Sequence, residues 1–209
     1  MKNIVFLNQK GGVGKTSLCL TWASKAFLDG QSVCVIDADP QQSAVGWKQA
    51  QGDKSKLSGM EVYSIDNSHD IEDLEGLNED ILFFDTAGND TALTRAVLEA
   101  SDLVIIPIKP SALDAKASIN SYRKVQAAEK PCLYLINQSI NNSRMTEETL
   151  KALRDAGVPH IENKIGNYTQ FIRTMGVGET PISDNPYSPA SIGMKKVIEE
   201  IEKFMKEEK

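Results

Sequence analysis

The fold of this chain is decided by the segment Gln9-Lys10-Gly11-Gly12-Val13-Gly14-Lys15-Thr16-Ser17. An apolar run precedes it, and a helical pattern starts at Lys15. A glycine-rich loop between a strand and a helix is the context that phosphate binding requires. Successive backbone N–H groups can converge on phosphate oxygens there, and the helix dipole favours anions. We expect Lys15 to reach the β- and γ-phosphates and the Thr16 hydroxyl to bind Mg²⁺.

Apolar segments of strand length alternate with helical patterns along the whole chain, which is typical of βαβ units. We expect an α/β fold: a single domain over residues 1–209 with a doubly wound, mostly parallel sheet and helices on both faces. The expected strands are Asn3–Leu7, Ser32–Ile36, Glu61–Ile65, Ile81–Phe84, Leu103–Pro107, Cys132–Ile136 and His160–Ile165. The expected helices are Lys15–Asp29, Gln42–Gln51, Thr91–Ala100, Ala112–Ala128, Thr146–Ala156, Thr169–Met175 and Ser191–Lys206. The segment Gly176–Pro189 is expected to be an irregular loop, because it is rich in glycine and proline.

Length and composition are those of one globular domain. The 209 residues are 41% hydrophobic and 25% charged, and the longest apolar runs, such as Leu103–Ile108, are far shorter than the ~20 residues of a membrane helix. The N-terminus lacks the apolar core and cleavage site of a signal peptide, so we expect a cytoplasmic protein. The three cysteines form no Cys-x-x-Cys pair, which favours buried thiols over disulfides or iron–sulfur ligation. The net charge of −6 argues weakly against a protein devoted to nucleic acid, although a local basic face is compatible with it.

Acidic residues follow two of the expected strands. Asp37 and Asp39 end the second strand, and Asp85 ends the apolar run Ile81–Phe84. Ligands of parallel α/β sheets bind at the carboxyl ends of the strands, so these acids are placed near the phosphate loop. Asp85 then reads as the residue that holds the Mg²⁺ shell. Gly88, three residues later, would let a backbone amide approach the γ-phosphate.

The loop also carries a second lysine. Residues 10–16, KGGVGKT, resemble the deviant Walker A loop of the ParA/MinD superfamily of P-loop ATPases, although Gln9 stands where the general pattern has glycine. The resemblance implies that Lys10 crosses a dimer interface and contacts the phosphates bound by the partner subunit. The alternative is a solvated surface lysine. Nucleotide state and dimerisation are coupled under the first interpretation.

Further segments extend this resemblance. Residues 37–41, DADPQ, resemble the Walker A′ segment, which implies that Asp39 orients the attacking water and that Asp37 supports the metal and the switch region. An Asp-Pro turn without a catalytic role is the alternative. Residues 101–114 resemble a segment of the small ParF-like ParA plasmid-partition ATPases.

The base-binding residues follow from the resemblance as well. It implies that Asn137 hydrogen bonds the adenine, unless it is a turn residue, and that the loop around Pro181 closes over the base. The implied cofactors are ATP and Mg²⁺. The implied catalytic residues are Lys10, Lys15 and Asp39, and the implied metal ligands are Thr16 and Asp85. The implied nucleotide-binding residues are Lys10, Gly11, Gly12, Val13, Gly14, Lys15, Thr16, Ser17, Asp37, Gly88, Asn137 and Pro181.

The resemblance to partition ATPases implies a function for the whole chain. An ATP-bound homodimer would bind DNA non-specifically on the nucleoid. A centromere-binding partner of the ParB or ParG kind would stimulate hydrolysis, and plasmid or chromosomal DNA would be segregated. Non-specific DNA binding requires clustered basic residues. The candidates are Lys164, Arg173, Lys195, Lys196 and Lys203, although acidic residues interleave with the last three.

Two alternatives keep the ATPase and change its cargo or its location. A ParA-like ATPase that positions a protein assembly cannot be separated from a partition ATPase by sequence. A MinD-like membrane ATPase would need a basic amphipathic helix at the C-terminus. Residues 197–209 are amphipathic, but their polar face is mostly glutamate, so we expect the last helix to pack on the sheet and no membrane partner.

Overall fold

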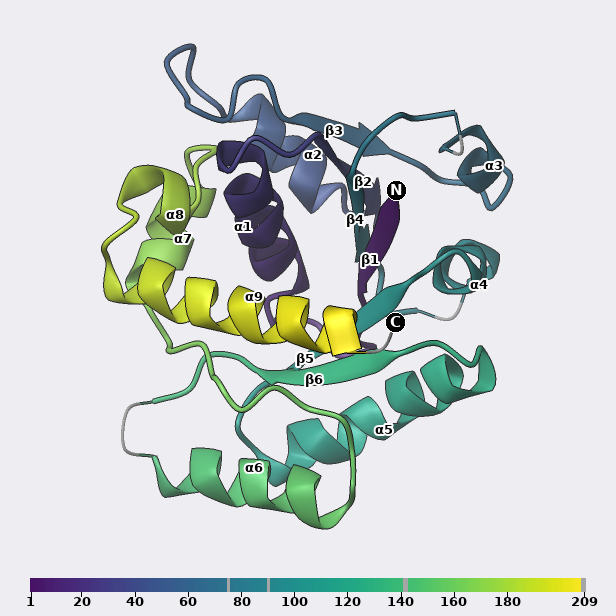
Figure 1. Ribbon diagram of the computed structural model, residues 1–209, viewed down its shortest axis with the longest axis vertical. Coiled ribbons are helices and arrows are strands. Elements are labelled where there is room, and N and C mark those ends of the chain that lie inside the picture. The colour runs from purple at the N-terminus through teal and green to yellow at the C-terminus, as the bar shows by residue number, and fades with distance from the viewer. Residues whose placement is uncertain (75, 90, 141–142, 208–209) are drawn as a thin grey trace.

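The computed structural model describes residues 1–74, 76–89, 91–140 and 143–207. Six strands form one parallel sheet in the order β3-β2-β4-β1-β5-β6 (Figure 1), which confirms the expected fold class. The first strand in the sequence lies inside the sheet, paired with β4 and β5. The strands are β1 (Lys2–Phe6), β2 (Val33–Ala38), β3 (Glu61–Ser64), β4 (Ile81–Thr86), β5 (Leu103–Ile108) and β6 (Cys132–Ile136).

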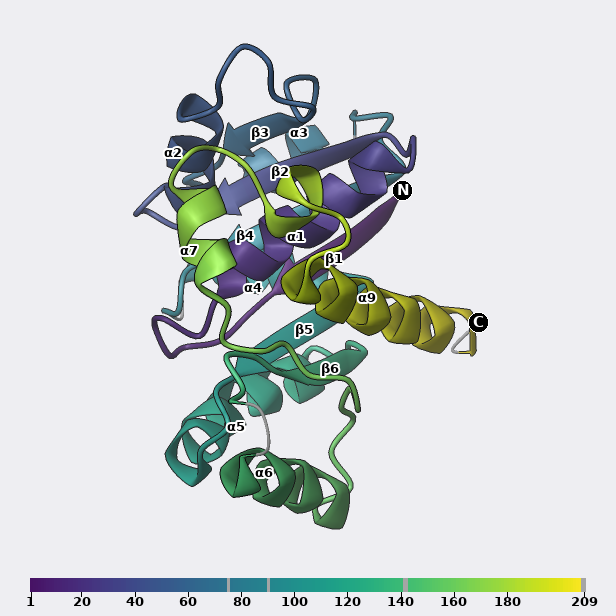
Figure 2. The ribbon, with the colours of Figure 1, turned by 90° about the vertical axis from the view of Figure 1, so that its left-hand side faces the viewer.

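Helices cover both faces of this sheet (Figures 1 and 2). One face packs against α1 (Lys15–Leu28), α2 (Ser43–Gln49), α7 (Thr169–Met175), α8 (Pro181–Asp184) and α9 (Pro189–Glu207). The other face packs against α3 (Asp70–Leu74), α4 (Ala92–Glu99), α5 (Ala112–Ala127) and α6 (Arg144–Asp155).

The central strands are mostly apolar because their residues alternate between the two cores, whereas the edge strand β3 is largely exposed. In β1, Ile4 and Phe6 belong to the core under α1, whereas Val5 belongs to the core on the opposite face. Trp22 of α1 contacts the rings of Phe6 and Phe83 edge-on, at centroid distances of 6.3 and 5.4 Å. This packing fixes α1, and therefore the loop that precedes it, on the centre of the sheet.

The expected strand His160–Ile165 is wrong. The segment makes only isolated parallel bridges beside β6, at its two ends. Between them, the backbone N–H groups of Glu162 and Asn163 donate to the carboxylate of Glu200 on α9, at 2.6 and 3.0 Å. Those donors are therefore lost to the sheet, and the strand is interrupted.

The expected irregular loop at Gly176–Pro189 is also wrong in part. It contains the short helix α8, which begins after Thr180 with a capping box that pairs Thr180 and Ser183. Pro181 occupies the first turn, where its missing N–H costs nothing. The helix α3 was not expected either, whereas the three cysteines are free and buried, as expected.

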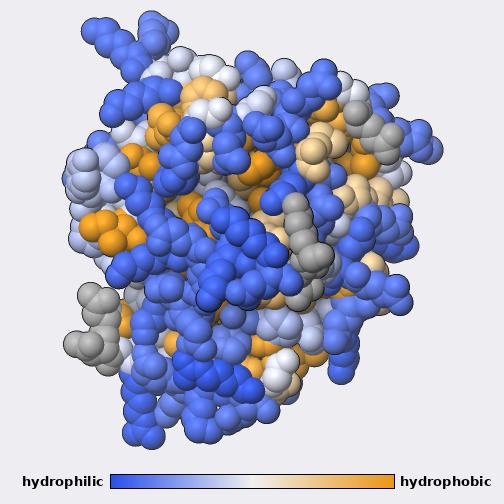
Figure 3. Space-filling view, in the orientation of Figure 1, coloured by the Kyte–Doolittle hydropathy of each residue, from blue (hydrophilic) through white to orange (hydrophobic). Residues whose placement is uncertain are grey.

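The C-terminal helix packs on the sheet, as expected. Met194, Val197, Ile198 and Ile201 of α9 are buried in the core under α1. Hydrophilic side chains cover the opposite, outward side of this helix (Figure 3). Within residues 1–74, 76–89, 91–140 and 143–207, the structure contains no helix with the length and apolar character that a membrane span requires.

The environment of Trp22 generates a first prediction. Trp22→Ala should lower the free energy of unfolding by about 3–5 kcal/mol, because it removes a buried ring and leaves a cavity against Phe6 and Phe83. Urea denaturation followed by far-UV circular dichroism measures this change. The control Tyr187→Ala removes an exposed ring and should stay within about 0.5 kcal/mol of the wild type. A loss below about 1 kcal/mol for Trp22→Ala would contradict this account of the core.

Candidate nucleotide-binding site

The glycine-rich loop joins the end of β1 to the start of α1 and is anchored before it turns. The buried Asn8 side chain donates to the carbonyl of Pro107 at 2.7 Å and accepts the backbone N–H of Lys10 at 2.9 Å. The backbone N–H of Gln9 donates to the hydroxyl of Ser121 on α5 at 3.1 Å. The first half of the loop is thus tied to β5 and to α5.

Two glycines in the loop have backbone conformations that other residues avoid. Gly12 and Gly14 have φ values of +72° and +94°. A Cβ on Gly14 would also lie 2.3 Å from the side-chain nitrogen of Asn137. That nitrogen donates to the carbonyl of Val13 at 2.8 Å, and the Gln138 amide donates to Gly12 at 3.0 Å. The end of β6 therefore supports the second half of the loop.

A hydroxyl and a carboxylate meet below the loop. Thr16 Oγ1 donates to Asp85 Oδ2 at 2.6 Å, from the first turn of α1 to the end of β4. The other Asp85 oxygen is buried and has no hydrogen-bond partner among the described residues. A hydroxyl beside an unsatisfied carboxylate oxygen fits Mg²⁺, which takes one or two carboxylates and completes its shell with phosphates and water. No group of three or more His, Cys, Asp or Glu side chains in the described ranges could hold a metal alone.

The charge of Asp85 is costly in this place. Burial raises the pKa of Asp85 to about 7, against the hydrogen bond from Thr16, and the negative charge of Asp37 adds to the rise. The nearby Lys15 lowers the pKa through its positive charge. A cation arriving at this carboxylate would remove an existing electrostatic penalty.

The two acids after β2 have different surroundings. Asp37 is buried beside Asp85 in the sheet register, and its Oδ2 accepts the backbone N–H groups of Ala44 and Val45 at 2.8 and 3.1 Å. It therefore holds the start of α2, and burial raises its pKa. Asp39 is half-buried, and its Oδ1 accepts the N–H of Gln41 at 2.9 Å.

The turn after β4 touches the loop directly. A Cβ on Gly88 would lie 2.5 Å from the carbonyl oxygen of Gln9, so only glycine allows this approach. Thr86 holds the same region by donating its hydroxyl to the carbonyl of Phe6 at 2.8 Å. Gly88 therefore lies against the loop, and the approach of its backbone amide to the γ-phosphate stays a prediction.

Lys10 points to its own subunit. Its Nζ lies 2.8 Å from Oδ1 of Asp114, in the first turn of α5. Burial would raise the pKa of Asp114, but hydrogen bonds from Lys10 and Ser111 outweigh it and hold that pKa below its ordinary value. The segment of residues 101–114 was singled out by its resemblance, but no signal in the sequence pairs Lys10 with Asp114.

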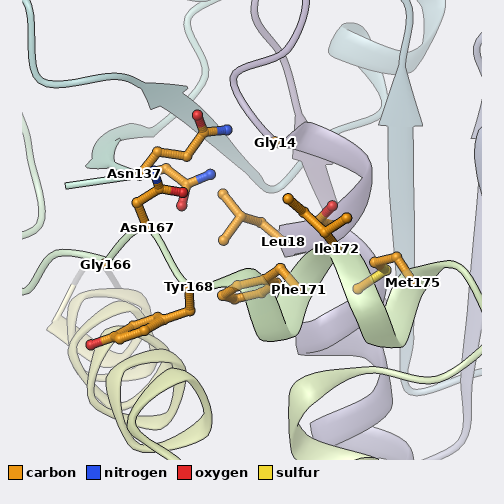
Figure 4. Close-up of a pocket in the computed structure, with 11 residues that line it drawn as sticks. Gly14, Leu18, Asn137, Gly166, Asn167, Tyr168, Phe171, Ile172 and Met175 are labelled. Atoms are coloured by element: carbon orange, nitrogen blue, oxygen red, sulfur yellow. The ribbon is translucent and has the colours of Figure 1, made fainter. Parts of the chain in front are cut away.

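A cavity of about 180 Å³ opens beside the loop (Figure 4). The apolar side chains of Leu18, Phe171 and Ile172 line it, and the amides of Asn137 and Asn167 lie on one side of it. Apolar walls with a few polar groups are typical of small-molecule and cofactor sites. Asn137 therefore lies both at this cavity and at the loop, and its hydrogen bond to adenine stays a prediction.

Pro181 does not line this cavity. It is buried in the first turn of α8, and the preceding helix α7 supplies Phe171 and Ile172 to the lining. Its role over the base stays a prediction. Sequence reasoning missed Asn167, Phe171 and Ile172, which belong to no motif. Their only signal was the apolar pair Phe171-Ile172 in an expected helix, of which Ile172 is 77% exposed.

The basic residues considered for DNA binding are mostly engaged by other groups. Lys164 pairs with Glu147, Arg173 with Asp184 and Lys203 with Glu207, and Lys195 donates to the carbonyl of Pro186. Lys196 is exposed. The five side chains therefore do not add up to an uncompensated basic surface on this subunit.

The buried charge of Asp85 generates a second prediction. The folded-state pKa of about 7 exceeds the ordinary value of 3.8, so the wild type loses stability as pH rises through this range. Asp85→Asn removes this titration. It should raise the free energy of unfolding of the nucleotide-free protein at pH 8 by on the order of 2 kcal/mol, and by less than half as much at pH 5.

Urea denaturation at the two pH values measures the effect of Asp85→Asn. Asp155→Asn is the matched control, because Asp155 is exposed in an i,i+4 pair with Lys151. It should give no gain at either pH. Equal or lower stability of Asp85→Asn at pH 8 would contradict the assigned cost of the buried carboxylate.

Comparison with known proteins shows which family this sequence belongs to. The family model of the CobQ/CobB/MinD/ParA nucleotide binding domain matches residues 4–203. The protein VirC1 of Rhizobium rhizogenes is 30% identical over 130 residues, which are 60% of this chain and 56% of that relative. The chain thus spans about half the length of the VirC1 proteins that it matches.

Other relatives carry more descriptive names. The maintenance of carboxysome distribution protein A of Halothiobacillus neapolitanus is 28% identical over 166 residues, 76% of each chain. The chromosome-partitioning ATPase Soj of Thermus thermophilus is 33% identical over 122 residues, 53% of this chain and 47% of the relative. The septum site-determining protein MinD of Pyrococcus horikoshii, solved with Mg-ADP, has the same fold, with a TM-score of 0.74 at 15% identity over 97% of this chain and 96% of that one. The chain belongs to the CobQ/CobB/MinD/ParA family of nucleotide-binding domains.

Proposed function

We propose that this protein is a ParA-type ATPase that binds ATP with Mg²⁺ and hydrolyses it slowly until a partner stimulates it. The observation that carries the proposal is the Thr16–Asp85 pair below the glycine-rich loop, with one Asp85 oxygen buried and unsatisfied. Membership of a nucleotide-binding family and the name of the Soj relative support the same activity.

The loop would hold the phosphates. Backbone N–H groups of residues 11–17 would bind their oxygens, and Lys15 would neutralise their charge. Thr16 and Asp85 would hold Mg²⁺, which neutralises charge that develops on the β- and γ-phosphate oxygens. Leu18, Phe171 and Ile172 would enclose the adenine, with Asn137 and Asn167 at its polar edge.

Asp39 would orient the attacking water. It is half-buried after β2, its Oδ1 accepts the backbone N–H of Gln41, and its negative charge acts on Asp85. Phosphoryl transfer depends mainly on positioning and charge neutralisation. The described residues of the loop and the cavity include no arginine, which supports slow turnover of the subunit alone.

Lys10 would join two subunits. It lies at the start of the loop, and its side chain is 40% exposed, so it is accessible to a second subunit. In the proposed homodimer each Lys10 contacts the phosphates bound by the other subunit. Dimerisation then depends on nucleotide, because the attraction exists only when phosphate charge is present.

The dimer would serve DNA partition, with non-specific DNA binding and a centromere-binding ParB- or ParG-like partner in the cytoplasm. The Soj relative supports this cargo. Positioning of a protein assembly is a second candidate, favoured by the carboxysome distribution relative, whose match covers 76% of the chain. The structure of α9 does not favour the membrane alternative, because the apolar side chains on its inner face pack in the core.

The two loop lysines generate a third prediction. Lys15→Gln should weaken ATP binding by about 10- to 100-fold, because it removes a charged hydrogen bond to phosphate. Lys10→Gln should bind ATP normally and remain monomeric. Calorimetry measures binding, and sedimentation velocity with AMPPNP and magnesium measures association. Normal dimers of Lys10→Gln would refute the role of Lys10 across the interface.

Asp39 and the cargo generate a fourth prediction. Asp39→Ala should reduce the turnover number by about 100-fold or more while ATP binding is retained, because the water loses its orienting group.

ATPase assays with and without non-specific duplex DNA at several salt concentrations test the partition function. DNA stimulation that falls steeply with salt is expected. Liposome co-sedimentation is the control, and stimulation by lipid instead of DNA would contradict the proposal.

A further inference from the structure

The Lys10 side chain is held within its own subunit. Its Nζ lies 2.8 Å from Asp114 Oδ1, and the Asp114 side chain is only 7% exposed. The backbone N–H of Lys10 is held by the Asn8 side chain. The ion pair with Asp114 can therefore break by movement of the Lys10 side chain, without movement of the loop backbone. A lysine bound here cannot simultaneously contact phosphates in another subunit.

Asp114 is built to stay charged. Its carboxylate accepts the hydroxyl of Ser111, and its backbone N–H donates back to that hydroxyl at 3.0 Å. The residue lies in the first turn of α5, where the helix dipole favours an anion. The pKa of Asp114 lies below its ordinary value, so the carboxylate is ionised at neutral pH.

The charge of a second lysine acts on the same carboxylate. The charge of Lys109, at the end of β5, also lowers the pKa of Asp114. Lys109 Nζ lies 3.9 Å from the position that a Cβ on Gly12 would occupy, so it reaches the middle of the loop. Asp114 thus pairs with Lys10 of the loop, and the charge of Lys109 also acts on its carboxylate.

We propose that Asp114 is a latch that holds Lys10 in the separate subunit and releases it to the phosphates of a second, nucleotide-loaded copy of this chain, while Lys109 balances the charge left on Asp114. The inference rests on the proposed nucleotide-dependent dimer and describes the position of Lys10 in the subunit before it dimerises. The ion pair competes with the intersubunit contact. The latch therefore raises the protein concentration needed for dimerisation and suppresses association of subunits that lack nucleotide.

Asp114→Asn isolates the charge, because asparagine retains an acceptor for Ser111 and the backbone donor. With saturating AMPPNP and magnesium, sedimentation equilibrium should show half-dimerisation at about tenfold lower protein concentration than the wild type, since two partly exposed ion pairs no longer need to break. Nucleotide affinity at low protein concentration should be unchanged. Asp155→Asn, which breaks an ion pair in α6, is the matched control and should dimerise like the wild type.

Lys109→Gln is the second variant, and it should change the concentration of half-dimerisation in the opposite direction. It leaves Asp114 with Lys10 alone, so half-dimerisation should require a several-fold higher protein concentration. Dimerisation of Asp114→Asn at the wild-type concentration or above it, or unchanged or easier dimerisation of Lys109→Gln, would overturn the latch. A wild type that stays monomeric with AMPPNP would overturn the proposed dimer, and the latch with it.

Discussion

The site depends on the hydrogen bond between the Thr16 hydroxyl and the Asp85 carboxylate. It joins the first turn of α1 to the end of β4 at the centre of the sheet. The bond satisfies one oxygen of a buried acid and leaves the other without a partner. An uncompensated carboxylate in a water-excluded place attracts a cation more strongly than it would at the surface. The fold thus stores an electrostatic cost at the point where a metal and phosphates would remove it.

The remaining parts of the site keep the loop in position around this pair. Asn8 holds its start, Gly88 contacts its first turn through the backbone, and Asn137 supports its end. These contacts come from β1 itself and from the segments after β4 and β6. The parallel sheet brings the carboxyl ends of these strands to one edge, which is why residues distant in sequence converge there.

Sequence reasoning worked where a local pattern has a single physical explanation. Glycine spacing made the loop predictable, and continuous apolar runs made the buried strands and the acids at the ends of β2 and β4 predictable. The segment at His160–Ile165 carries only Ile161 and Ile165 as apolar residues, and two of its donors go to Glu200, 38 and 37 residues away, which no local pattern reveals. Pro181 and the pair of Lys10 with Asp114 were likewise decided by tertiary packing.

One more contact links the two ends of the site. The indole N–H of Trp47 in α2 donates at 3.0 Å to the carbonyl of Glu179, in the segment that follows α7. The start of α2 is held by Asp37, and α7 carries Phe171 and Ile172. This hydrogen bond therefore ties α2, which Asp37 anchors, to the chain that follows the cavity wall. In the proposed nucleotide complex, it would connect the surroundings of the phosphates with those of the base.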